Sequence, residues 1–155
     1  MKLPSTTQRV ILHSARWKTE KIENKMVERL DYYNVHPGDI EERLHKLDEE
    51  WDIERTLETN ASSLALLGLA LGVTISAWFY ILSALVMGFL LQHALQGWCP
   101  PVPLFRRLGV RTQSEIERER YALKALRGDF NDLCPATHKA GEPSSVATVI
   151  KATLR

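Results

Sequence analysis

The two side chains best suited to chemistry in this sequence lie close together near the end of its longest apolar stretch. Cys99 is followed by prolines and then by arginines, and nearby cations can lower a thiol pKa and make the thiolate reactive. His93 precedes it, and a histidine inside a membrane helix is a candidate cofactor ligand. The first hypothesis is therefore redox or sulfur-relay chemistry at Cys99, or a haem ligand shared across a dimer at His93.

Each of these residues also has a simpler interpretation. No second thiol or obvious base lies near Cys99 in the sequence, and a free cysteine usually behaves as a small apolar residue. His93 lies beside Gln92 and about one turn before Gly97, where headgroup water can satisfy it. We favour a packed cysteine and an interfacial, hydrogen-bonding histidine. We assign no catalytic residue, no metal ligand and no cofactor.

The charged residues divide the chain into three blocks. Residues 1–58 carry 10 basic and 13 acidic side chains, residues 59–105 carry neither kind, and residues 106–155 carry 10 basic and 6 acidic ones. The formal net charge of +1 gives no reason to expect a nucleic acid partner. Neither cysteine belongs to a disulfide framework or a zinc motif, which favours a reducing compartment.

The uncharged block predicts a transmembrane helical hairpin over residues 59–98. Its apolar residues form two groups separated at Ser76, and each group, extended at its outer end, reaches about 17 to 20 residues, enough to cross a hydrocarbon core. A helix buried in a soluble bundle usually keeps a charged outer face, which both of these segments lack. We therefore prefer the membrane interpretation to a water-soluble hairpin.

Small residues recur along both helices at the spacing that lets membrane helices pack closely. Gly68 and Gly72 form a GxxxG pattern, and Ala84 and Gly88 repeat the spacing on the second helix. These pairs can pack the two helices of one chain together or form a dimer seam. GxxxG occurs often by chance in apolar sequence, so packing within the chain is the preferred interpretation.

The segment after the second helix is expected to be a membrane exit. Proline stops a helix, so we expect the chain to become extended at the membrane surface and to present arginines to phosphates. Lysines and arginines flank the hairpin, while its turn has none, which places both termini in the cytoplasm. The predicted exit residues are Trp98, Cys99, Pro100, Pro101, Arg106, Arg107 and Arg111.

Amphipathic helices are predicted on both sides of the hairpin. Residues 1–58 should form two cytoplasmic helices broken near 34–38, the first over 5–33 and the second with its apolar stripe ending at Trp51. In residues 99–128, a helix capped by Ser114 and Glu117 should end at Gly128. Residues 129–155 are expected to be a loose tail.

The first cytoplasmic helix is basic and the second acidic. The two could form an antiparallel pair, or the basic helix, with Trp17, could lie on anionic lipid. We favour the pair. The only apolar run near the start, Val10 to Leu12, is too short for a signal peptide, so no cleaved leader is expected.

Residues 53–111 resemble the two-helix transmembrane domain that accompanies some bacterial inner-membrane rhodaneses. The resemblance is carried by "ASSLALLGLALG", "AWFYILSALVMGFLLQHALQGWCPPVPLFRRLG" and the arginines that follow. A rhodanese cysteine needs a loop of backbone amides, and Pro100 and Pro101 remove two of them. The resemblance therefore implies a stand-alone membrane anchor in the bacterial inner membrane, without the rhodanese domain.

The sequence as a whole predicts an all-α, multi-pass membrane protein with no enzymatic activity. Its expected role is a small anchor, scaffold or accessory subunit. The expected partners are the lipid bilayer and either further copies of the chain or a larger membrane complex. The alternative from another class is a membrane-bound thiol redox or sulfur-relay component that acts through Cys99.

Overall fold

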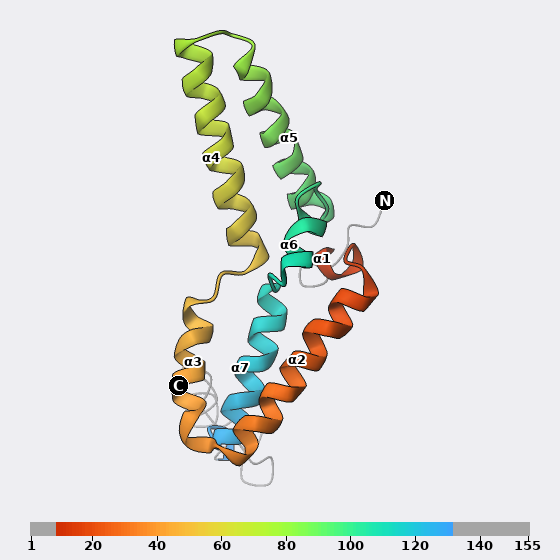
Figure 1. Ribbon diagram of the computed structural model, residues 1–155, viewed down its shortest axis with the longest axis vertical. Coiled ribbons are helices and arrows are strands. Elements are labelled where there is room, and N and C mark those ends of the chain that lie inside the picture. The colour runs from red at the N-terminus through yellow and green to blue at the C-terminus, as the bar shows by residue number, and fades with distance from the viewer. Residues whose placement is uncertain (1–8, 132–155) are drawn as a thin grey trace, which may run out of the picture. The chain divides into compact units, whose positions relative to one another are not determined.

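The computed structural model describes residues 9–131, and every regular element within that range is a helix. The all-α prediction is confirmed for these residues. The elements are α1 (Arg9–Leu12), α2 (Arg16–Val35), the short 3₁₀ helix η1 (Pro37–Asp39), α3 (Ile40–Glu49), α4 (Ile53–Thr74), α5 (Phe79–Gln96), α6 (Val102–Leu108) and α7 (Gln113–Arg127) (Figure 1).

The chain divides into two compact units, and each combines segments from both sides of the uncharged stretch. The first unit contains residues 1–25 and 50–116, and the second contains residues 26–49 and 117–155. Helices α2 and α7 each contribute residues to both units. The predicted tail beyond residue 131 and the predicted helix start at Ser5 lie outside the described residues.

In the first unit, α4 and α5 run antiparallel beside each other and are joined by residues 75–78 (Figure 1). Helix α4 begins at Asp52, whose carboxylate accepts a hydrogen bond of 2.8 Å from the amide of Arg55. Helix α5 ends at Gly97, which adopts a φ of 75° that other residues rarely tolerate. Two helical stretches, the one that ends at Thr74 and α5 itself, are long and apolar enough to cross a membrane.

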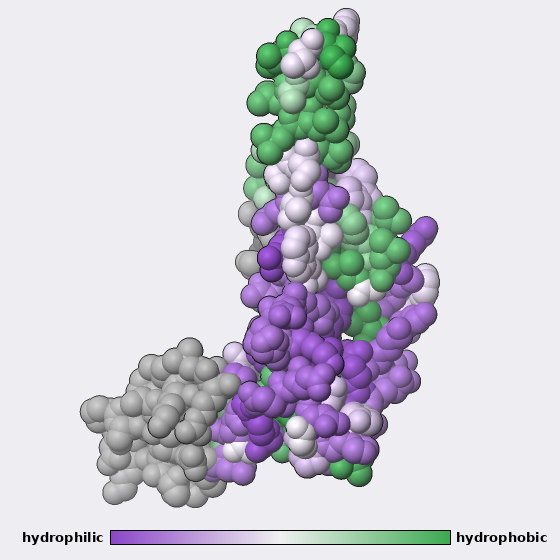
Figure 2. Space-filling view, turned by 60° about the vertical axis from the view of Figure 1, so that its left-hand side comes forward, coloured by the Kyte–Doolittle hydropathy of each residue, from purple (hydrophilic) through white to green (hydrophobic). Residues whose placement is uncertain are grey.

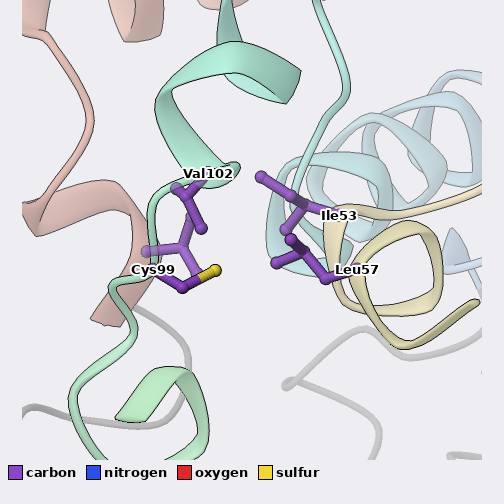
Figure 3. Close-up of a cluster of buried hydrophobic side chains, with 5 residues drawn as sticks. Ile53, Leu57, Cys99 and Val102 are labelled. Atoms are coloured by element: carbon purple, nitrogen blue, oxygen red, sulfur yellow. The ribbon is translucent and has the colours of Figure 1, made fainter. Parts of the chain in front are cut away.

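A small apolar cluster closes the end of this pair that lies opposite the turn; we call it the base cluster. It brings together three distant segments: α1, the first turns of α4, and the chain that follows α5 (Figure 3). Phe105 and Val110 pack against it. The base cluster consists of Val10, Ile53, Leu57, Cys99 and Val102.

The prolines after Cys99 do not keep the chain extended, which corrects the predicted membrane exit. Helix α6 begins directly after Pro101, and Pro103 lies in its first turn. Amides in a first helical turn have no partner within the helix, so a proline there loses no hydrogen bond. The prolines therefore end α5 and also start the next helix.

In the second unit, the apolar stripe of α3 is buried, with Ile40, Leu44 and Leu47 among its buried side chains. Trp51 was expected to continue this stripe, but it lies beyond the end of α3 and is exposed. Helix α2 ends at Val35, inside the predicted break.

Within the second unit, two acidic side chains of α3 bind arginines of α7. Asp48 binds Arg120 and Glu41 binds Arg127, both on α7. In addition, Arg29 of α2 and Arg43 of α3 both bind the fully buried Glu119 of α7. Helix α7 is therefore the electrostatic partner of both neighbouring segments in this unit.

Two predicted helix starts also need correction. A single helix over 5–33 is wrong, because α1 ends at Leu12 and α2 begins at Arg16. Between them, Ser14 Oγ donates a 2.8 Å hydrogen bond to Val10 O. The capping box of α7 is formed by Thr112 and Glu115, two residues before the predicted pair: the Thr112 amide donates to Glu115 Oε2 at 2.8 Å, and the Glu115 amide to Thr112 Oγ1 at 3.3 Å.

Candidate functional site: an apolar helical pair and its base

The outer surface of α4 and α5 carries many exposed apolar side chains, and on the face that Figure 2 shows it is most hydrophobic toward the turn. No lysine, arginine, aspartate or glutamate occurs between Thr59 and Phe105. A water-soluble monomer rarely exposes so large a continuous apolar surface. The exposed apolar side chains on this pair and its turn include Leu64, Leu66, Leu67, Leu69, Val73, Ile75, Trp78, Ile81, Leu85, Met87, Phe89, Leu91 and Leu95.

Several polar side chains on these two helices bind backbone carbonyls. Asn60 donates to the carbonyl of Thr56, Ser63 to that of Thr59, and Thr74 to that of Ala70, each within one helical turn. Ser83 of α5 instead donates at 2.8 Å to the carbonyl of Ala65 on α4, which links the two helices. Polar groups satisfied in this way carry a lower cost in lipid than free ones.

The glycines of the two small-residue patterns have different surroundings. A Cβ on Gly68 would lie 2.6 Å from Ser83 Oγ and 3.2 Å from the carbonyl oxygen of Phe79, and a Cβ on Gly72 would lie 2.5 Å from the ring of Tyr80. Both glycines therefore allow α4 and α5 to approach each other. By contrast, a Cβ on Gly88 would meet nothing within 4 Å.

Ala84, the other small residue of the second pattern, is also exposed. The structure thus assigns Gly68 and Gly72 to packing within the chain. The face of α5 that carries Ala84 and Gly88 stays open.

His93 is buried at the base of the pair, where its Nε2–H donates a 2.7 Å hydrogen bond to Glu54 Oε2 of α4. Its Nδ1 is buried without a hydrogen-bond partner among the described residues. The prediction that headgroup water satisfies His93 is wrong for Nε2, because an acidic side chain from the opposite helix does so.

Cys99 belongs to the base cluster and is only 4% exposed. Its thiol points toward Leu57 of α4 (Figure 3). Burial raises the pKa of this thiol, and the negative charge of Glu54 raises it further, although a contact with the Val102 amide acts in the opposite direction. These surroundings are those of a packed cysteine, and they disfavour the thiolate that relay chemistry needs.

Two of the three predicted interfacial arginines are buried in ion pairs, which corrects the expectation that they face phosphates. Arg106 is 1% exposed, and its guanidinium binds both carboxylate oxygens of Glu115 at 2.7 and 2.8 Å. Arg111 is also buried and binds both oxygens of Glu50. Only Arg107 is exposed.

The remaining exit residues divide between the surface and the interior. Trp98 is half-buried, while Pro100 and Pro101 are exposed at the start of α6. In addition, the amide of Ile53 donates to the carbonyl of Arg111 at 2.9 Å, which ties the chain after α6 to the start of α4. The segment therefore folds back on the base of the pair as a packed structure.

Sequence reasoning missed the acidic partners at this base. Glu115 could have been found, because Thr112 and Glu115 form an uninterrupted T-x-x-E pattern before a helix. Glu50 and Glu54 lie in a run of acidic residues, and nothing in their spacing points to Arg111 or His93. The contact of His93 depends on how α4 and α5 pair, and that of Arg111 on the return of the chain after α6 to the start of α4. Local sequence specifies neither.

Comparison of the chain with protein-family models, with curated proteins and with solved structures finds no match.

Proposed function

We propose that this protein is a small, non-enzymatic membrane protein in which α4 and α5 insert into the lipid bilayer and anchor the helices before and after them. The observation that supports this proposal best is the uncharged and largely exposed surface of α4 and α5. Its burial in lipid would remove a large apolar area from water, and the backbone groups inside both helices are already paired.

The resemblance to the transmembrane domain of inner-membrane rhodaneses supports the same role and proposes the bacterial inner membrane as its location. We propose a hairpin whose two termini both lie in the cytoplasm, because basic residues flank it and its turn has none. The apolar surface and the hydrogen-bonded serine, threonine and asparagine side chains are consistent with that arrangement.

As an anchor, the protein would act as a scaffold or accessory subunit, through self-association or through a larger membrane complex. The open face with Ala84 and Gly88 supports this part of the proposal, since small residues let a second membrane helix approach closely. Thiol relay chemistry is the weaker alternative, because Cys99 is buried and the pKa of its thiol is raised.

Membrane fractionation tests the anchor. The full-length chain should sediment with membranes and stay there after extraction at alkaline pH, which releases proteins bound only to the membrane surface. A variant with Leu66, Leu85 and Leu91 replaced by lysine should fail to insert, because each lysine at the centre of a membrane helix costs about 2.5–3.5 kcal/mol. A wild-type chain that remains in the soluble fraction as a folded monomer would refute the proposal.

A further inference from the structure

The base cluster sets the level of α6 along α4. Val102 of α6 packs with Ile53 and Leu57 of α4, and the apolar stretch of α4 begins near Ala61. At about 1.5 Å per residue, these contacts place α6 about 6–12 Å beyond Ala61 along the helix axis. The polar layer on each side of a bilayer is about 5–8 Å thick. The two ranges overlap, so with α4 and α5 inserted the side of α6 nearer the membrane reaches the level of the lipid headgroups.

The outer side of α6 is apolar. Leu104 and Leu108 lie one turn apart on the same side of the helix and are 56% and 72% exposed, while Val102 and Arg106 are buried on the other side. Leu12 of α1 is also exposed. Figure 2 shows a second hydrophobic patch at the level of α1 and α6, separate from the one on α4 and α5.

Basic side chains accompany these leucines. Lys18 at the start of α2 donates a 3.1 Å hydrogen bond to the carbonyl of Arg107, which joins the start of α2 to the end of α6. The Lys18 ammonium also lies 4.2 Å from the ring of the exposed Trp17. Over residues 16–25 there are four basic and two acidic side chains, and the exposed side of α6 carries Arg107 and no acidic residue. The local charge is therefore positive.

An amphipathic surface with leucines, a tryptophan and basic side chains is the pattern that binds at the interface of an anionic membrane. We infer that this surface, which we call the α6 face (Leu12, Trp17, Lys18, Leu104, Arg107 and Leu108), binds the headgroups of anionic phospholipids on the same side of the membrane as the base cluster. The inference rests on the proposed function. The leucines of the α6 face enter the boundary between headgroups and acyl chains, while its basic groups contact phosphates. Each basic residue strengthens docking by about fivefold at low salt.

Depth-dependent fluorescence quenching tests the inference in the full-length chain. An environment-sensitive fluorophore is attached to Leu108→Cys in a Cys134→Ser background, in which the buried Cys99 provides the labelling blank. Nanodiscs contain phosphatidylcholine alone or mixed with phosphatidylglycerol. The two quenchers are aqueous iodide and a lipid with a spin label near its headgroup. A label on Val35→Cys, where Val35 is as exposed as Leu108, measures iodide quenching of a water-exposed site.

We expect the label at 108 to be quenched by the spin-labelled lipid more strongly with phosphatidylglycerol than without it, and to be protected from iodide relative to the label at 35. Neutralising two charges, with Arg107→Gln and Lys18→Gln, should lower the ratio of docked to undocked protein by about 25-fold. Lipid quenching that is independent of both phosphatidylglycerol and these charges would overturn the role of anionic headgroups.

A third label, at Leu85→Cys near the middle of α5, separates this inference from the proposed function. If the label at 85 is protected from iodide while the label at 108 is quenched by iodide alone, the anchor stands and the inference about the α6 face fails. If both labels are open to iodide, the anchor fails as well. If the label at 108 is protected from iodide only in nanodiscs that hold more than one chain, a second copy of the chain covers this face. That result would also overturn the inference.

Discussion

The ion pair between Arg106 and Glu115 offers the sharpest test of the packing at the base of α4 and α5. Both oxygens of Glu115 accept hydrogen bonds from the Arg106 guanidinium, and one of them also accepts from the Thr112 amide. Arg106 has two further acceptors, Ser14 Oγ and the carbonyl of Val110. The side chains are 1% and 8% exposed, so water cannot replace a lost partner.

We expect Glu115→Gln to destabilise the protein strongly, because it leaves a buried guanidinium without its counter-charge. Breaking a buried pair in this way costs about 3–5 kcal/mol, a large part of the 5–15 kcal/mol of a typical domain. At about 2–4 °C per kcal/mol for a chain of this size, the midpoint of thermal unfolding should fall by about 6–20 °C. The double variant Arg106→Met, Glu115→Leu should recover most of the loss, because no charge is then left unpaired.

The measurement is the loss of helical circular dichroism on heating in detergent micelles. Glu20→Gln is the matched control, since Glu20 pairs with Arg16 at 3.3 Å on the surface, where such pairs contribute at most about 1 kcal/mol. Equal midpoints for Glu115→Gln and Glu20→Gln would refute the buried pair. A double variant no more stable than Glu115→Gln would show that the charge imbalance is not the cause of the loss.

The same pair predicts how stability depends on pH. Burial alone would raise the pKa of Glu115, but hydrogen bonds from Arg106 and the Thr112 amide, with the charge of Arg106, lower it below its ordinary value of 4.5. Because the folded pKa is lower than the unfolded one, the carboxylate stabilises the fold fully above the unfolded pKa, and this contribution is lost as pH falls through the folded pKa. The unfolding midpoint should therefore fall more steeply below pH 4.5 in the wild type than in Glu115→Gln.

Three further predictions concern the helical pair and its base. Gly68→Ala should lower the free energy of unfolding by about 1–3 kcal/mol, because the added methyl group overpacks the contact between α4 and α5. Gly88→Ala should leave the unfolding free energy unchanged or raise it. Equal effects of the two substitutions would contradict the observed packing. Cys99 should react with an alkylating reagent at least about tenfold more slowly in the folded chain than after denaturation, and equal rates would restore the relay hypothesis. Protein purified with haem supplied should be colourless, because Nε2 of His93 is already bound to Glu54; a haem absorption band lost in His93→Ala would disprove this.

The sequence predicts best those elements that depend on composition and local signals. The long stretch without charged residues can be read directly from the sequence, and its two helices follow from the separation of its apolar groups at Ser76. Helix α7 ends at Arg127, as the glycine at position 128 predicted, because Gly128 readily adopts the observed φ of 89°. In both cases the responsible residues are adjacent in the chain.

Contacts between distant residues were not predictable in the same way. His93 meets Glu54 only because α4 and α5 pack antiparallel in one particular register, and that register depends on close contacts such as Gly68 against Ser83. The break after Leu12 carries neither proline nor glycine, so no local signal marks it. The arginines after α5 were assigned to phosphates because their positive charge is visible in the sequence and their acidic partners are far away.

The continuity of α4 connects the chemistry at the base to the proposed position in the membrane. This helix runs without a break from Ile53, in the base cluster, to Thr74 at the turn, so the base cluster and the apolar surface belong to one stiff element about 33 Å long. Any vertical shift of α4 in the bilayer must therefore move Cys99, Val102 and α6 by the same amount. Fixing the α6 face at the headgroups would in turn fix the depth of the apolar helices, in addition to the charged residues at the start of α4 and the aromatic residues near the turn.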